Sequence, residues 1–66
     1  MTNASNMNIW EMMDCFGLIL HYYFGGEVRW IDNPRAMEVR YLIKNPDFGK
    51  LEIKYYWDDI ANFFTN

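Results

Sequence analysis

The chain has 66 residues, of which 52% are hydrophobic and 20% aromatic, and its nine acidic and six basic residues give a net charge of −3. A chain of this length forms one small core and has no room for a second domain or a deep substrate cleft. Its high hydrophobic fraction argues against disorder, and its negative charge disfavours direct binding to DNA or RNA. We therefore expect a single folded domain over residues 1–66.

The cysteine content and the longest apolar run indicate the compartment. Cys15 is the single cysteine, so no intrachain disulfide can form, and a reducing cytoplasm fits this composition best. The uncharged run from Cys15 to Gly26 is shorter than the roughly 20 residues of a membrane span, and no Lys or Arg precedes it as in a signal peptide. We expect a cytoplasmic protein without a membrane segment.

A helix is expected over residues 8–24, after a flexible tail of small polar residues at 1–6. Asn8 and Glu11 have the spacing of a capping box, and Gly25-Gly26 can end the helix because glycine adopts the left-handed conformation. Residues at helical spacing predict its buried face, namely Ile9, Met12, Met13, Phe16, Leu20 and Tyr23.

Alternating apolar and polar residues predict three strands, over residues 27–32, 36–44 and 50–57. Between the second and third strands, the segment 45–49 has the proline and glycine of a hairpin turn that places Lys44 opposite Lys50. The same register pairs apolar residues across the core side, namely Ile43 with Leu51, Tyr41 with Ile53, Val39 with Tyr55 and Met37 with Trp57.

The link between the first and second strands is expected to be a four-residue loop, 32–35. This loop would align Arg29 with Glu38 and Glu27 with Arg40. Cross-strand pairs of opposite charge contribute roughly 0.2–1 kcal/mol each, so this register is the one that the charges favour.

A short last helix is expected over residues 58–64, with Asp58 or Asp59 as its cap. The predicted fold class is therefore α+β, with the order α-β-β-β-α: a helix packed on a three-stranded antiparallel meander, closed by the short C-terminal helix. The aromatic residues assigned to the core are Phe16, Tyr23, Trp30, Tyr41, Tyr55, Trp57 and one or both of Phe63 and Phe64.

No motif in the chain indicates catalysis. The segment 47–49 spells the kinase tripeptide Asp-Phe-Gly, but the other kinase motifs are missing and a turn explains it. His21 lacks the companion ligands of a zinc site, and Cys15 lacks a neighbouring base, which favours a small buried hydrophobic role for Cys15. We expect no enzyme activity, no metal and no cofactor.

More aromatic and aliphatic residues are present than the expected core can hold. Those left toward solvent are Trp10, Leu18, Tyr22, Ile31, Leu42, Phe48 and Tyr56. Scattered apolar residues are ordinary on protein surfaces, but Trp and Tyr are also the residues enriched in protein interfaces. The candidate partner-binding residues are Trp10, Glu11, Asp14, Leu18, His21, Tyr22, Glu27, Tyr56, Asp58 and Asp59.

In size, acidity and lack of motifs the chain resembles the small phage-encoded inhibitors of bacterial defence, which include the anti-CRISPR proteins. The resemblance is one of general character over the whole chain and rests on no shared motif. It implies a non-enzymatic inhibitor, acting in the host cytoplasm, that blocks a larger nucleic-acid-handling protein such as a CRISPR effector. It further implies that the acids among the candidate residues face basic groups of that partner.

Two further expectations follow from the strands. Arg29, Arg40 and Lys54 interrupt the acidic residues on the outer side of the sheet, which favours steric blocking over mimicry of DNA. The first and third strands have open edges that Glu27, Lys50 and Lys54 protect lightly. The alternative function is therefore a homodimer or an obligate small structural subunit of a larger complex.

Overall fold

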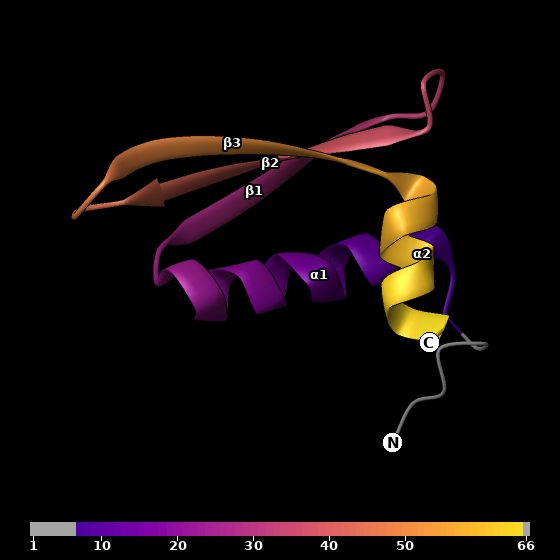
Figure 1. Cartoon of the computed structure of the whole chain (residues 1–66), viewed down its shortest axis with the longest axis horizontal. Helices are drawn as coiled ribbons and strands as arrows, with labels where there is room; N and C mark the ends of the chain where they lie inside the picture. The colour runs from indigo at the N-terminus through magenta and orange to yellow at the C-terminus, as the bar shows by residue number, and fades with distance from the viewer. Residues whose placement is uncertain (1–6, 66) are drawn as a thin grey trace.

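The computed structural model describes residues 7–65, which form two helices and one sheet. The elements in chain order are α1 (Ile9–Phe24), β1 (Glu27–Asn33), β2 (Glu38–Asn45), β3 (Gly49–Tyr56) and α2 (Trp57–Thr65). The strands form an antiparallel sheet in the order β1-β2-β3, with α1 along one face and α2 at the end of the sheet nearest the start of α1 (Figure 1). The predicted α-β-β-β-α order is confirmed, whereas the predicted tail at 1–6 lies outside the described residues.

The core lies between α1 and the sheet. Its buried apolar residues are Met12, Met13, Phe16, Leu20, Val39, Tyr41, Ile43 and Ile60. The three from β2 are at most 1% exposed, because a strand covers β2 on each side and α1 packs against it. The Tyr41 hydroxyl donates a hydrogen bond of 2.6 Å to the Met13 carbonyl, so this buried polar group is satisfied.

The ends of α1 are set as the sequence predicts. The Glu11 amide donates to Asn8 Oδ1 at 2.9 Å, and the Asn8 amide donates to Glu11 Oε1 at 3.3 Å, which completes the capping box. Gly25 ends the helix with a φ of 68°. A Cβ atom at Gly26 would overlap the Lys44 carbonyl oxygen, so the second glycine allows β1 to start close against β2.

The register between β2 and β3 is confirmed. The observed pairs include Lys44 with Lys50, Ile43 with Leu51, Tyr41 with Ile53 and Val39 with Tyr55. The predicted pair of Met37 with Trp57 is not formed, because β2 begins at Glu38 and Trp57 belongs to α2. Gly49, which ends the turn, has a φ of 85°, a conformation that glycine adopts at low cost. The residues of the turn therefore predicted the register of this hairpin.

The predicted register between β1 and β2 is wrong by four residues. Glu27 lies opposite Lys44 and Arg29 opposite Leu42, so the expected cross-strand ion pairs do not form. The observed register instead places Trp30 opposite Tyr41 and covers the buried side of β2 along its length. Burial of apolar area contributes roughly 0.8 kcal/mol per CH₂ group, whereas an exposed ion pair contributes roughly 0–1 kcal/mol, so the core determines the register.

The loop between β1 and β2 therefore falls at residues 34–37, later than predicted. Met37 was expected in the second strand, but its φ of 52° is left-handed and cannot continue a strand. Asp32 was expected in the loop, but it belongs to β1, where its Oδ1 accepts a hydrogen bond of 2.8 Å from Trp57 Nε1.

The last helix begins one residue before its predicted start. Because α2 starts at Trp57, neither Asp58 nor Asp59 is its N-cap, and both lie in its first turn, where a carboxylate interacts favourably with the helix dipole. The Trp57 amide donates to the Met37 carbonyl at 2.9 Å and ties the start of α2 to the β1–β2 loop.

The predicted core contains residues that the structure leaves outside. Tyr23 is 80% exposed, because α1 packs mainly against β1, β2 and α2 and its last turn extends past the part that α2 covers. Cys15 is partly buried instead of fully buried. Of the last two phenylalanines, Phe64 packs against the core and Phe63 is exposed.

Candidate protein-binding surface

Six of the ten candidate partner-binding residues lie on α1 outside its buried stripe; Leu18 and Tyr22 point away from the sheet, and Asp14 reaches the β1 edge. We call this surface the α1 outer face and define it by Trp10, Glu11, Asp14, Leu18, His21 and Tyr22, all of which are exposed. The helical period explains the arrangement, because the buried residues of α1 occupy the opposite stripe.

Large side chains project from the α1 outer face without entering the core. Leu18 is 65% exposed and Tyr22, one helical turn further on, is 90% exposed. No Asp, Glu, Lys or Arg occurs between Cys15 and Gly26, so this half of the face offers apolar area, a phenol group and the imidazole of His21. Such a combination is typical of residues that anchor a protein interface.

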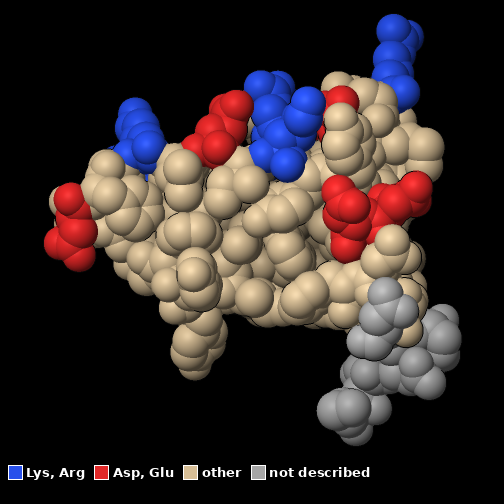
Figure 2. Space-filling model, viewed as in Figure 1, with Lys and Arg blue, Asp and Glu red and all other residues tan. Residues whose placement is uncertain are grey.

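The N-terminal half of the α1 outer face adjoins the start of α2. The Trp10 ring meets the Trp57 ring edge to face at 5.7 Å, which holds Trp10 against α2. Asp58 and Asp59 follow directly on α2 and are exposed. Figure 2 shows acidic side chains together at the place where α2 begins. Trp10 and these aspartates therefore lie at the same end of the molecule.

The acidic residues at this end have no basic partner among residues 7–65. The three ion pairs in that range all belong to the sheet, at 3.1 Å for Arg29–Glu27, 3.9 Å for Arg40–Glu52 and 3.7 Å for Lys54–Glu38. Asp14 accepts a hydrogen bond of 3.0 Å from Trp30 Nε1, which fixes its position beside β1 without neutralising it. The end formed by α1 and α2 is thus complementary to a basic surface.

The remaining two candidates lie on the other side of the molecule. Glu27 and Tyr56 belong to the sheet face that points away from α1, at the outer ends of β1 and β3. Glu27 forms its ion pair with Arg29, and Lys54 lies 5.6 Å from the centre of the Tyr56 ring. The ten candidates therefore divide between two faces, and they do not form one continuous surface.

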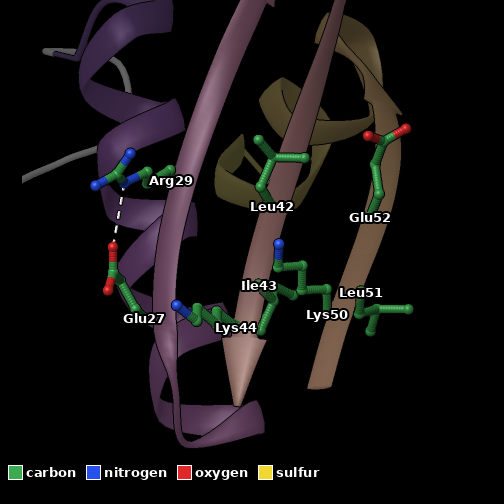
Figure 3. A pocket seen from close by; sticks show the side chains of 8 residues that line it. All are labelled: Glu27, Arg29, Leu42, Ile43, Lys44, Lys50, Leu51 and Glu52. Atoms are coloured by element: carbon green, nitrogen blue, oxygen red, sulfur yellow. Dashed lines mark hydrogen bonds and ion pairs between the residues drawn. The ribbon is translucent and has the colours of Figure 1, made fainter. Parts of the chain in front are cut away.

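The outer face of the sheet also carries an open hollow of about 540 Å³. Eight residues from all three strands line it, and Figure 3 labels them. Lys44 and Lys50 lie opposite each other there, beside the Glu27–Arg29 pair and the apolar side chain of Leu42. The lining mixes both signs of charge, which suits contact with polar protein surface better than burial of an apolar ligand.

Three titratable side chains near α1 take part in its packing, namely His21, Tyr41 and Tyr55. His21 Nδ1 contacts the Gly26 carbonyl oxygen and so joins the last turn of α1 to the residue after it. Burial raises the pKa of Tyr41, and the nearby charges of Asp14 and Tyr55 raise it further. Burial likewise raises the pKa of Tyr55. Both phenols are thus neutral at physiological pH.

Within residues 7–65, no group of three or more His, Cys, Asp or Glu side chains is placed to hold a metal ion. In the same range, no helix is both long enough and apolar enough to cross a membrane.

An apolar surface that the sequence did not reveal lies beside β3. On one side α1 reaches β1 through the Asp14–Trp30 hydrogen bond, so its opposite side, with Ile19 and Tyr23, faces β3. We call this surface the β3 flank and define it by Ile19, Tyr23, Leu51, Ile53 and Phe63. It was missed because Tyr23 and Phe63 carry the same periodic signal as buried residues.

No family model, curated protein or solved structure matches this chain.

Proposed function

We propose that this chain is a non-enzymatic protein-binding inhibitor that acts in the bacterial cytoplasm. Its α1 outer face would occupy a site on a larger, nucleic-acid-handling protein and block that site sterically. The observation that carries the proposal is the exposure of Leu18 and Tyr22 on the same face as the carboxylates of Glu11 and Asp14, which have no basic partner among residues 7–65. The general resemblance to anti-CRISPR proteins supports the same choice of partner.

The α1 outer face implies a partner site of defined chemistry. Leu18 and Tyr22 require an apolar pocket, in which Tyr also gains a hydrogen bond through its hydroxyl. Glu11 and Asp14 require basic groups beside that pocket, and Asp58 and Asp59 extend the acidic area onto α2. Proteins that bind nucleic acid carry such basic groups to contact phosphates.

Steric blocking explains the charge distribution better than mimicry of DNA. A DNA mimic would present a dense array of carboxylates. On this chain, the outer face of the sheet interleaves the bases Arg29, Arg40 and Lys54 with the acids that pair with them. A helix that inserts apolar side chains and adds a few carboxylates is the mode of binding that we infer.

A plating assay tests this function. Bacterial strains that each carry one CRISPR defence system would express the chain and then be challenged with a targeted phage. We expect plaques to be restored in at least one strain, and we expect Leu18→Asp to abolish this effect. Ile31→Asp is the matched control, because Ile31 is also an exposed aliphatic residue but lies on the sheet.

Circular dichroism of both variants would verify that they fold. Equal plating by Leu18→Asp and the unchanged chain would contradict a role for the α1 outer face. If the unchanged chain restored plaques in none of the strains, the proposed class of partner would be contradicted.

A further inference from the structure

β3 is an edge strand whose core side is incompletely covered. Leu51, Ile53 and Tyr55 point to the core side of the sheet but remain partly exposed, whereas their counterparts on β2 are at most 1% exposed. A strand edge with uncovered apolar residues is a template for pairing with another strand.

Val28 and Trp30 on β1 are partly exposed as well, so the two edges of the sheet differ in the side chains that lie beside them. At the β1 edge, α1 packs against the strand, and Trp30 Nε1 donates a hydrogen bond to Asp14 on α1. At the β3 edge, Ile19 and Phe63 are 40% and 54% exposed, and Tyr23 is exposed further still. Figure 1 shows β3 in front of the other strands, and Figure 2, in the same view, shows uncharged surface between the charged upper rim and α1.

We propose that two copies of this chain pair through β3, antiparallel, about a two-fold axis at Ile53. The two sheets would then join into one continuous sheet, with both α1 helices on the same side. The β3 flanks of the two copies would face each other beneath the joined strands and cover each other's apolar residues. An isologous contact of this kind closes on itself and produces a dimer, not a fibre.

Charge complementarity identifies a second copy as the occupant. The outer side of β3 carries Lys50, Glu52 and Lys54 in alternation. With the axis at Ile53, Glu52 lies opposite Lys54 of the second copy, and the symmetry repeats this pair. On the core side, Ile53 meets itself and Leu51 meets Tyr55 of the second copy, so each inward pair is apolar.

Neighbouring registers are less favourable. An axis at Glu52 would place Glu52 opposite itself and Lys50 opposite Lys54, which opposes like charges. An axis at Leu51 would leave Tyr55 and Tyr56 without a partner strand, because β3 begins at Gly49. The alternating lysines therefore protect the edge from general pairing while permitting one specific register.

This dimer leaves the α1 outer face free. Leu18 and Tyr22 lie on the stripe of α1 that points away from the sheet, whereas the contact uses β3 and the side of α1 nearest to it. The proposed inhibitory function and the proposed dimer consequently depend on different residues and can fail separately.

Light scattering coupled to size-exclusion chromatography tests the dimer. We expect the unchanged chain to show twice its 8.0 kDa mass. Glu52→Lys and Lys54→Glu each oppose like charges across the axis, so each should weaken dimerisation at least about tenfold. Combining both changes in one chain restores opposite charges, and so does mixing the two single variants.

Two control variants distinguish the β3 contact from contacts through the β1 edge or the α1 outer face. Arg29→Glu changes a charge at the β1 edge, and Leu18→Asp changes the α1 outer face. Both should keep the mass of the unchanged chain, and circular dichroism would verify that each variant is folded. A monomeric unchanged chain up to millimolar concentration would overturn the proposal. So would dimers that survive Glu52→Lys and Lys54→Glu separately, or dimers that Leu18→Asp dissociates.

Discussion

Tyr41 shows how a single residue joins the two layers of the molecule. Its ring is buried against Phe16, with the ring centres 5.6 Å apart, and its hydroxyl donates to the Met13 carbonyl on α1. Burial raises the pKa of Tyr41 because the phenolate would lose its hydration there. The folded state therefore requires this phenol to keep its proton.

Replacing this phenol gives a prediction about alkaline pH. Because the pKa of Tyr41 is raised on folding, its contribution is complete below the unfolded pKa of about 10, and stability falls by about 1.4 kcal/mol per pH unit above it. Tyr41→Phe should cost about 0.5–1.5 kcal/mol at neutral pH through the lost hydrogen bond. Above pH 10, its free energy of unfolding should decline less steeply than that of the unchanged chain. Urea titrations at several pH values measure both slopes, and equal slopes would contradict this description of Tyr41.

Asn45 connects three segments through one buried amide. Its Nδ2 donates to the carbonyls of Phe24 and Gly25 at 2.8 and 2.9 Å, and its Oδ1 accepts from the Asp47 amide at 2.7 Å. Carbonyls at a helix C-terminus lack partners within the helix, so Asn45 supplies one for α1.

Removing this amide should destabilise both the end of α1 and the β2–β3 turn. We expect Asn45→Ala to lower the free energy of unfolding by about 1–3 kcal/mol, because it leaves buried polar groups unsatisfied. Asn33→Ala, at the exposed end of β1, should change it by less than about 0.5 kcal/mol. Chemical denaturation measures both values, and similar effects of the two variants would contradict the role given to Asn45.

Residue contacts were predictable from the sequence where they are local. Asn8 and Glu11 are three positions apart, so their capping box follows from spacing alone. The bonds of Asn45 to α1 and of Trp57 to Asp32 join residues 20 or more positions apart. Which of the polar residues would meet in this way depends on how the layers pack, and no local pattern contains that information.

At the scale of elements, the two hairpins show why one register was predictable and the other was not. The β2–β3 turn contains Pro46 and Gly49, whose backbone preferences set the pairing directly. The β1–β2 loop contains Met37 in a left-handed conformation that its residue type does not favour. Tertiary packing of Trp30 and Tyr41 overrides local preference there.

The observed register predicts which charged pairs interact. Glu38 lies 3.7 Å from Lys54 across the β2–β3 ladder, whereas Arg29 lies opposite Leu42. A double-mutant cycle of Glu38→Gln and Lys54→Gln should give a coupling energy of about 0.2–1 kcal/mol. The cycle of Glu38→Gln and Arg29→Gln should give a value near zero. A larger coupling to Arg29 than to Lys54 would contradict the observed register.

For the whole molecule, the periodicity of the sequence predicted the fold class, but it predicted only part of the exposed apolar surface. Leu18 and Tyr22 were predicted to face solvent because they lie opposite the apolar stripe of α1. Tyr23 belongs to that stripe and yet is exposed, because α1 lies nearer β1 than β3. The sideways position of a helix beneath a sheet depends on packing of the whole core, so the β3 flank could not be predicted from sequence.

The molecule thus presents two apolar surfaces with different charge environments. The α1 outer face combines Leu18 and Tyr22 with acids that form no ion pair within residues 7–65, which suits a different protein with basic groups. The β3 flank adjoins an open strand whose charges complement themselves, which suits a second copy. These two surfaces contain six of the exposed large hydrophobic residues, namely Trp10, Leu18, Ile19, Tyr22, Tyr23 and Phe63.

The most direct test of the central claim, that the α1 outer face binds another protein, is affinity purification of the tagged chain from bacterial lysate with quantitative mass spectrometry. We expect the unchanged chain and Ile31→Asp to recover one larger protein in stoichiometric amount, and Leu18→Asp to recover at least about tenfold less of it. Recovery of no stoichiometric protein, or equal recovery by Leu18→Asp and the unchanged chain, would contradict the claim.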